Sequence, residues 1–178
     1  DYVFRKRPSD RVSPLSANTW IIIINVVIFV MGALSPPFQR AANDWGHLST
    51  DTVTYAGGLQ FWRFLTFQFL HANLSHVFFN MFGLYMFGAM VEDYLGRSRY
   101  IAFYLTTGVM GGLLFMVLNA LGALAKDAGM QQIPGLLVYN TNIRLVGASA
   151  GVFGVIMACA FISPNSIINL LIPPIPLK

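Results

Sequence analysis

Three polar side chains in a largely apolar sequence have the types and spacing needed for hydrolytic chemistry. His76 and Asn80 are four residues apart, so on a helix they share one face. Ser149 lies among small residues (147–151, Gly-Ala-Ser-Ala-Gly), which would let a substrate backbone approach its hydroxyl. Two hydrogen-bond donors on one face, opposite a serine, can stabilise an anionic oxygen. These residues therefore indicate nucleophilic catalysis at Ser149.

A structural role is the alternative for each of these residues taken alone. Polar side chains in a membrane often form hydrogen bonds between helices, worth about 0.6 kcal/mol on average. Gly147 and Gly151 have the spacing of a close helix contact, which would explain the small residues without chemistry. His71, five residues before His76, is expected to point about 140° away from it on a continuous helix. The pair His76 and Asn80, set opposite a glycine-flanked serine, favours function.

Two other kinds of site fit the sequence less well. Gly-x-Ser-x-Gly also occurs at the nucleophile of α/β-hydrolases, but no strand pattern precedes Ser149, and no acidic residue or histidine follows it. A metal site would use His47, His71 and His76, yet their spacing is not that of a zinc helix and no glutamate lies between them. We expect His47 to be a surface loop residue, and we expect no metal and no cofactor.

The elements that carry these residues follow from the charge distribution. Of 178 residues, 56% are hydrophobic and only 10% charged, against about 25% charged in soluble domains. The segments 12–39, 64–91, 100–125 and 145–177 contain no Asp, Glu, Lys or Arg. This pattern excludes a soluble enzyme and a disordered chain, and its continuous apolar runs argue against a membrane barrel. The net charge of +4 is too sparse for nucleic-acid binding. The sequence therefore predicts an all-α polytopic membrane protein.

Four spans are predicted, because a membrane helix needs about 20 mainly apolar residues. They cover approximately residues 19–34, 69–91, 100–124 and 146–163. The loop 35–68 contains the aromatic residues Trp45, Tyr55 and Trp62, and is expected to lie at the membrane interface. The chain begins at Asp1 without a methionine and ends at Lys178 after a proline-rich stretch, so we expect truncation at both ends.

Basic residues predict the orientation of these spans. A cytoplasmic N-terminus places seven Lys and Arg residues inside and four outside, which agrees with the excess of basic residues in cytoplasmic loops. The second and fourth spans then both run inward from the outer side. Their first residues lie at one depth, so His76, Asn80 and Ser149 are expected at the same level of the outer leaflet.

Several segments resemble rhomboid intramembrane serine proteases. They are Trp62-Arg63, residues 69–81 (Phe-Leu-His-Ala-Asn-Leu-Ser-His-Val-Phe-Phe-Asn-Met), Glu92 with Gly96 and Arg99-Tyr100, Gly147-Ala148-Ser149 followed by Val152-Phe153-Gly154, Pro164-Asn165, and residues 175–178. The resemblance covers nearly the whole chain in the same order. The combination of His-x4-His-x3-Asn with a later Gly-x-Ser is far more specific than either motif alone.

The resemblance implies a single rhomboid-like helical bundle over residues 1–178, with four visible spans of an expected six or more. It implies cleavage of single-span membrane proteins within or beside their transmembrane segments, in the lipid bilayer. Ser149 would be the nucleophile, and His76, Asn80 and the N–H groups of Ser149 and Ala148 would form the oxyanion site. The expected structural anchors are Trp62, Arg63, Glu92, and Arg97 or Arg99.

The sequence departs from the family pattern at two points. The family usually has glycine directly after the serine, where this chain has Ala150. Its general base is a histidine on the sixth span, which would lie beyond residue 178. From the residues alone His76 is the best-placed base, but the resemblance gives it the oxyanion role. The alternative function is a catalytically inactive rhomboid-like protein that binds transmembrane segments. We expect a multi-pass protein of the plasma membrane with the N-terminus cytoplasmic and the site facing outward.

Overall fold

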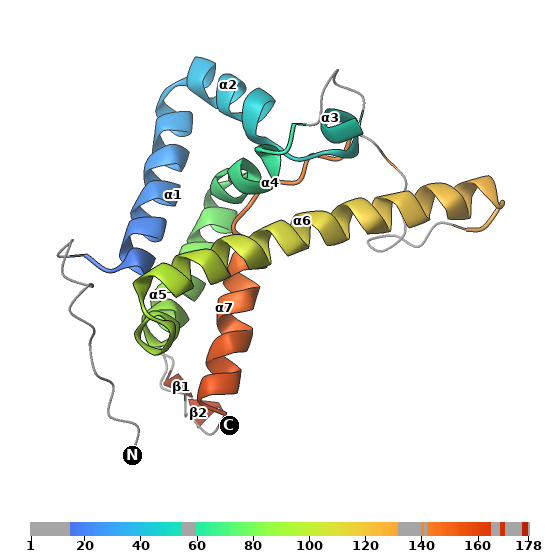
Figure 1. The fold of residues 1–178 in the computed structure, drawn as a ribbon. Helices are drawn as coiled ribbons and strands as arrows, with labels where there is room; N and C mark the ends of the chain where they lie inside the picture. Colours follow the sequence, from blue (N-terminus) through green and yellow to red (C-terminus); the bar gives the residue numbers. More distant parts are fainter. Residues whose placement is uncertain are drawn as a thin grey trace.

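Most of the described residues are helical in the computed structural model (Figure 1). The structure describes residues 15–54, 60–131, 140, 142–164, 168–169 and 176–177. The helices are α1 (Ala17–Leu34), α2 (Pro36–Gly46), α3 (Thr50–Thr54), α4 (Arg63–Thr66), the 3-10 helix η2 (Phe67–Phe69), α5 (Leu74–Leu95), α6 (Arg97–Asp127) and α7 (Ser149–Ile162). β1 (Ile168–Asn169) and β2 (Pro176–Leu177) form one short antiparallel pair.

The prediction of an all-α membrane protein is confirmed. Within the described ranges, α1, α5 and α6 are long and apolar enough to cross a membrane. The fourth predicted span is shorter than expected: α7 has 14 residues, which is about 21 Å of helix. Several residues used in the sequence analysis lie outside the described ranges: Arg5, Lys6, Arg7, Arg11, Tyr55, Asn165, Ile175 and Lys178.

The second long helix begins five residues later than the sequence analysis expected. Asn73 caps α5: its backbone is extended, and its Oδ1 accepts a hydrogen bond from His76 N at 2.9 Å. The residues before this cap form η2 and then the extended Leu70. The predicted interfacial loop is also partly helical, because Ser35 and two prolines start α2 directly after α1.

Glu92 of α5 joins the first helix to the bundle. Its two carboxylate oxygens accept hydrogen bonds from the main-chain N–H groups of Ala17 and Asn18, each at 2.8 Å. A carboxylate at a helix N-terminus satisfies donors that the helix leaves unpaired. Tyr100 of α6 then donates to Asn18 Oδ1 at 2.7 Å. The expected anchor Glu92 therefore holds the start of α1.

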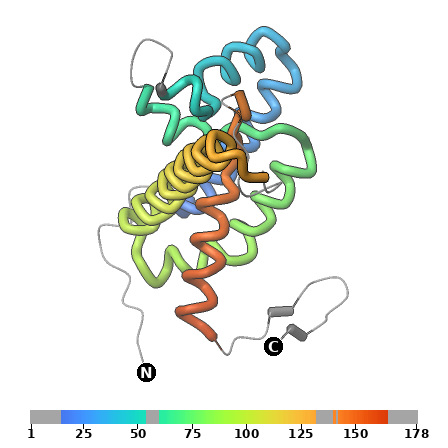
Figure 2. Tube along the Cα trace, turned by 90° about the vertical axis from the view of Figure 1, so that its right-hand side faces the viewer, coloured from blue at the N-terminus to red at the C-terminus, as the bar shows by residue number. Residues whose placement is uncertain are grey.

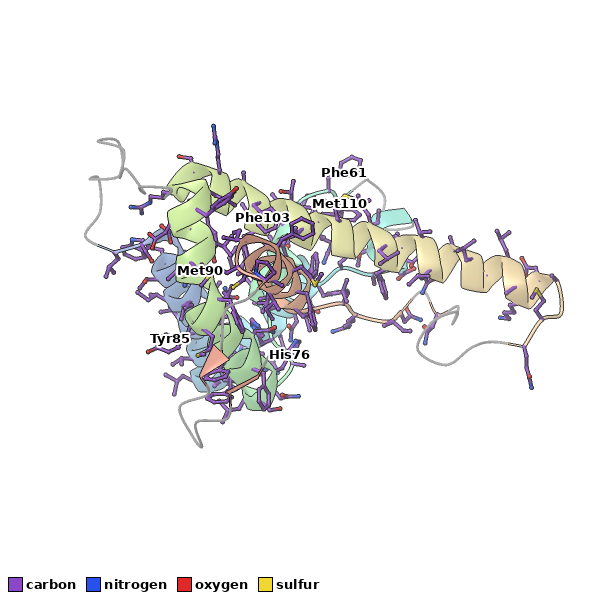
Figure 3. All side chains as sticks on the ribbon, turned by 90° about the horizontal axis from the view of Figure 1, so that it is seen from below. Phe61, His76, Tyr85, Met90, Phe103 and Met110 are labelled. Atoms are coloured by element: carbon purple, nitrogen blue, oxygen red, sulfur yellow. The ribbon has the colours of Figure 1, made fainter. Side chains whose placement is uncertain are left out.

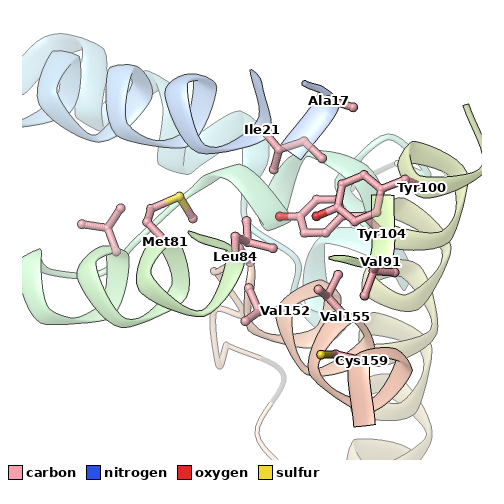
Figure 4. Packing of buried hydrophobic residues seen from close by; sticks show 12 residues of the cluster. Ala17, Ile21, Met81, Leu84, Val91, Tyr100, Tyr104, Val152, Val155 and Cys159 are labelled. Atoms are coloured by element: carbon pink, nitrogen blue, oxygen red, sulfur yellow. The ribbon is translucent and has the colours of Figure 1, made fainter. Parts of the chain in front are cut away.

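Glycine allows α7 to lie close to both α5 and α6. A Cβ atom added to Gly151 of α7 would lie 2.7 Å from the Tyr104 side chain of α6. A Cβ atom added to Gly83 of α5 would lie 2.8 Å from the Val152 side chain of α7. Figure 2 shows α7 running between α5 and α6, and Figure 4 shows Tyr104, Leu84 and Val152 in the core that these helices share. The close packing holds the start of α7 in a fixed position relative to α5.

Candidate active site

Ser149 is the first residue of α7, and three main-chain hydrogen bonds hold the segment before it. Gly147 N donates to the carbonyl of Phe67 in η2 at 2.9 Å. Two residues earlier, Leu145 and Leu48 form an isolated antiparallel bridge with N–H···O distances of 2.7 and 3.1 Å. Residues that are about 80 to 100 positions apart in the sequence therefore fix the approach to Ser149.

The imidazole of His76 lies against the backbone at Gly147. A Cβ atom at residue 147 would lie 2.5 Å from His76 Cε1 and 2.6 Å from Nε2. Gly147 also has a φ of 126°, which side-chain-bearing residues rarely adopt. Only glycine therefore fits here, and the ring of His76 reaches within two residues of Ser149. Figure 3 looks approximately along α7, with His76 and Met90 on α5 at one side and Phe103 on α6 at the other.

Asn80 lies one turn further along α5 and is 6% exposed. Its position falls between two contacts of α5 with the segment 147–152, namely His76 with Gly147 and Gly83 with Val152. Among the described residues, Asn80 Nδ2 is buried without a hydrogen-bond partner. A buried amide donor without a partner costs free energy in the free protein and is available to a bound acceptor.

The prediction that His71 points away from His76 is wrong. It lies before the cap of α5, so the helical argument that turned it away from His76 does not apply. The two imidazole rings meet edge to face, with centroids 5.1 Å apart. Burial, with a further contribution from His76, lowers the pKa of His71 to about 4, so this imidazole is neutral at pH 7. The Asn73 N-cap is the sequence signal that would have placed His71 outside the helix.

The expectation that His47 is a surface residue was also wrong. It is 7% exposed, and its ring nitrogen Nδ1 pairs with the carbonyl of Asn43. The described ranges contain no group of three His, Cys, Asp or Glu side chains arranged to hold a metal ion.

Arg63 joins α2 to the segment that leads to α5. Its guanidinium donates to the carbonyls of His47 at 2.8 Å and Asp44 at 2.7 Å, and to Gln60 Oε1 at 2.5 Å. The neighbouring Trp62 donates from Nε1 to the carbonyl of Trp45 at 3.1 Å. These contacts support the expected structural roles of Trp62 and Arg63, whereas Arg99 is exposed at the start of α6.

The methyl group of Ala150 points at α6. A Cβ atom built on Gly111 would lie 2.4 Å from Ala150 Cβ, so the two residues are in direct apposition. Ala150 stands where the family usually has glycine, and its methyl group fits because Gly111 on α6 has no side chain.

We expect Ala150→Gly to change cleavage by less than about threefold and to cost about 1 kcal/mol of stability, the usual penalty of a helical glycine. Gly111→Ala should be more destabilising because it overlaps the Ala150 methyl, and the double variant should recover part of that loss. Thermal denaturation in detergent and cleavage of a transmembrane reporter measure both effects. A rate increase above tenfold in Ala150→Gly would show that the methyl obstructs substrate.

The fold and this site define a polytopic helical membrane protein with a serine at a helix start, a histidine against the glycine two residues before that serine, and a buried asparagine one turn along from the histidine. A profile of the rhomboid domain matches residues 58–177, which is more than half of the chain. The chain belongs to the rhomboid family.

Relatives of the chain include proteases and an inactive member. Rhomboid-like protease 3 of Toxoplasma gondii is 24% identical over 120 residues, covering 66% of this chain and 46% of the relative. Rhomboid-like protein 11, chloroplastic, of Arabidopsis thaliana is 31% identical over 135 residues, covering 76% and 38%. Inactive RHOMBOID-like protein 8 of the same plant is 35% identical over 74 residues, covering 36% and 21%. The matched part is thus less than half of each relative.

Proposed function

We propose that this chain carries the nucleophile and the oxyanion site of an intramembrane serine endopeptidase. The observation that carries the proposal is the imidazole of His76 against Gly147, with the unpaired amide of Asn80 one turn away. His76 lies against the residue two positions before α7, a helix whose first N–H groups have no intrahelical partner. A serine hydroxyl beside several convergent donors suits acyl transfer.

In the proposed mechanism, Ser149 Oγ attacks the carbonyl carbon of the scissile peptide bond. The negative charge that develops on the carbonyl oxygen is stabilised by His76, Asn80 and the main-chain N–H groups of Ser149 and Ala148. A general-base histidine takes the hydroxyl proton and gives it to the leaving amine, which leaves an ester on Ser149. The same base then activates a water molecule that hydrolyses the ester. This histidine would lie beyond residue 178, as the rhomboid resemblance implies.

The proposed substrates are transmembrane or membrane-adjacent segments of single-span proteins. A helical backbone hides its carbonyls from attack, so substrates with small or helix-breaking residues near the outer face are favoured. The proposed orientation has the N-terminus in the cytoplasm and Ser149 toward the outer side, on the basis of the Lys and Arg distribution. The proposed location is the plasma membrane.

Labelling with a fluorophosphonate tests the proposal, because this reagent modifies an activated serine and not an ordinary one. The full-length protein, folded in detergent, should be labelled at one site, which mass spectrometry should locate at Ser149. Ser75, an exposed serine near the start of α5, is the internal control and should remain unmodified. Labelling of both serines at the same slow rate would contradict the proposal.

The second candidate is an inactive rhomboid-like protein that binds transmembrane segments. It is favoured by the similarity to the inactive relative from Arabidopsis thaliana. Binding of a transmembrane peptide without cleavage, together with an unlabelled Ser149 in folded protein, would support this candidate.

A further inference from the structure

A cavity lies away from Ser149, in the angle between α1 and α2. It has a volume of about 480 Å³ and is lined mainly by apolar side chains, among them Ile24, Ile28, Phe38, Ala42, Trp45 and Trp62. None of Ser149, His76 and Asn80 lines it. Its size is within the range of about 300–1,000 Å³ that is usual for small-molecule sites.

Three hydrogen-bond donors on the wall of this cavity are paired within the protein. The hydroxyl of Thr66 donates to the carbonyl of Gly46 at 3.0 Å, and the indole N–H of Trp62 donates to the carbonyl of Trp45 at 3.1 Å. The main-chain N–H of Leu70 bonds to the carbonyl of Phe67 at 3.2 Å. These donors offer nothing to a polar ligand, so the cavity suits a hydrocarbon.

The cavity is continuous with the lipid-facing side of α1. This helix is long and apolar enough to cross a membrane, and its exposed side chains include Ile24 and Val27, at 42% and 48% exposure. Ile24 belongs both to that exposed surface and to the cavity wall. Across the cavity, Trp45 is 69% exposed, and tryptophan is enriched where protein meets the membrane interface. Lipid chains therefore have direct access to the cavity.

We propose that this cavity binds one acyl chain of a bilayer phospholipid. Without a chain, the walls would lack the dispersion contacts that a packed interior provides. A bound chain bridges α1 and α2 and keeps the α2–α4 segment docked. That segment carries Arg63 and leads into η2, whose Phe67 carbonyl holds Gly147. The proposal does not depend on catalysis at Ser149.

Tryptophan fluorescence provides the test, since the chain has three tryptophans and two of them line the cavity. Trp20→Phe leaves Trp45 and Trp62 as the tryptophans of residues 1–178, and any tryptophan elsewhere in the full-length protein is also replaced by phenylalanine. The full-length protein, delipidated in detergent, is titrated with phosphatidylcholine brominated on its acyl chains. We expect saturable quenching that is complete at about one lipid per protein. Quenching that rises linearly without saturation would overturn the proposal.

Two substitutions by phenylalanine separate the cavity from the general lipid-facing surface. Ala42→Phe fills the cavity and should weaken lipid binding, so that the half-saturating lipid concentration rises by about tenfold or more. Val27→Phe places the same side chain on the exposed face of α1 and should leave the titration unchanged. If Ala42→Phe does not fold, Ala42→Leu should give a smaller loss in the same direction. Equal titrations of the Ala42 and Val27 variants would contradict the proposal, as would quenching by brominated free fatty acid but not by phospholipid.

Discussion

Ser149→Ala is expected to reduce cleavage of a transmembrane reporter by about 10⁴-fold or more, to the background rate. The substitution removes only the hydroxyl that would form the acyl bond. It should not disturb folding, because Ser149 is only partly buried and α7 has no side-chain cap at Ala148. The loss would therefore be chemical, with an unchanged melting temperature.

Quantitative cleavage in reconstituted vesicles measures this effect in the full-length protein. Ser75→Ala is the matched control, because the exposed Ser75 hydroxyl bonds to the neighbouring Asn73 Oδ1, at 2.8 Å. The control should retain cleavage within about threefold, since surface substitutions usually have small effects. A Ser149→Ala rate within tenfold of the unmodified protein would exclude Ser149 as the nucleophile.

Asn80→Ala is expected to lower kcat by about 10²–10³-fold, the effect of losing one oxyanion donor. KM should change little, because the charge that this amide stabilises develops only in the transition state. The amide nitrogen has no hydrogen-bond partner among the described residues, so its removal should leave the melting temperature unchanged or raise it. Loss of activity without loss of stability is the result that separates a catalytic role from a structural one. His76→Ala should lower kcat by a similar factor, about 10²–10³-fold.

Asn119→Ala is the control for removing a buried asparagine. Asn119 lies on α6, is 3% exposed, and donates from Nδ2 to the carbonyl of Asn140 at 3.1 Å. This variant should lose stability by about 1 kcal/mol and keep its kcat at permissive temperature. If Asn80→Ala behaves in the same way, Asn80 holds the helices together and does not stabilise an oxyanion.

Charge spacing was sufficient to predict the helical membrane fold, because a charged side chain in hydrocarbon is costly wherever it occurs. The start of α5 was less predictable. An apolar run extends back through Phe69, so hydropathy places the helix too early, whereas the Asn73 side chain competes for the backbone and starts it at Leu74. Because of this cap, His71 lies before the helix and beside His76, and not on the far side of a continuous helix.

By itself, the sequence determined the membrane class and the order of the helices, and it predicted that His76 and Asn80 lie opposite Ser149. These properties depend on composition and on spacing within one helix. The tertiary structure decided that Glu92 caps α1, that the Ala150 methyl faces Gly111, and that Asn80 Nδ2 stays unpaired. Each of these depends on which residues, distant in sequence, come into contact when the helices pack. Spacing along a helix does not specify those partners, because they are set by the close approach that glycines on neighbouring helices permit.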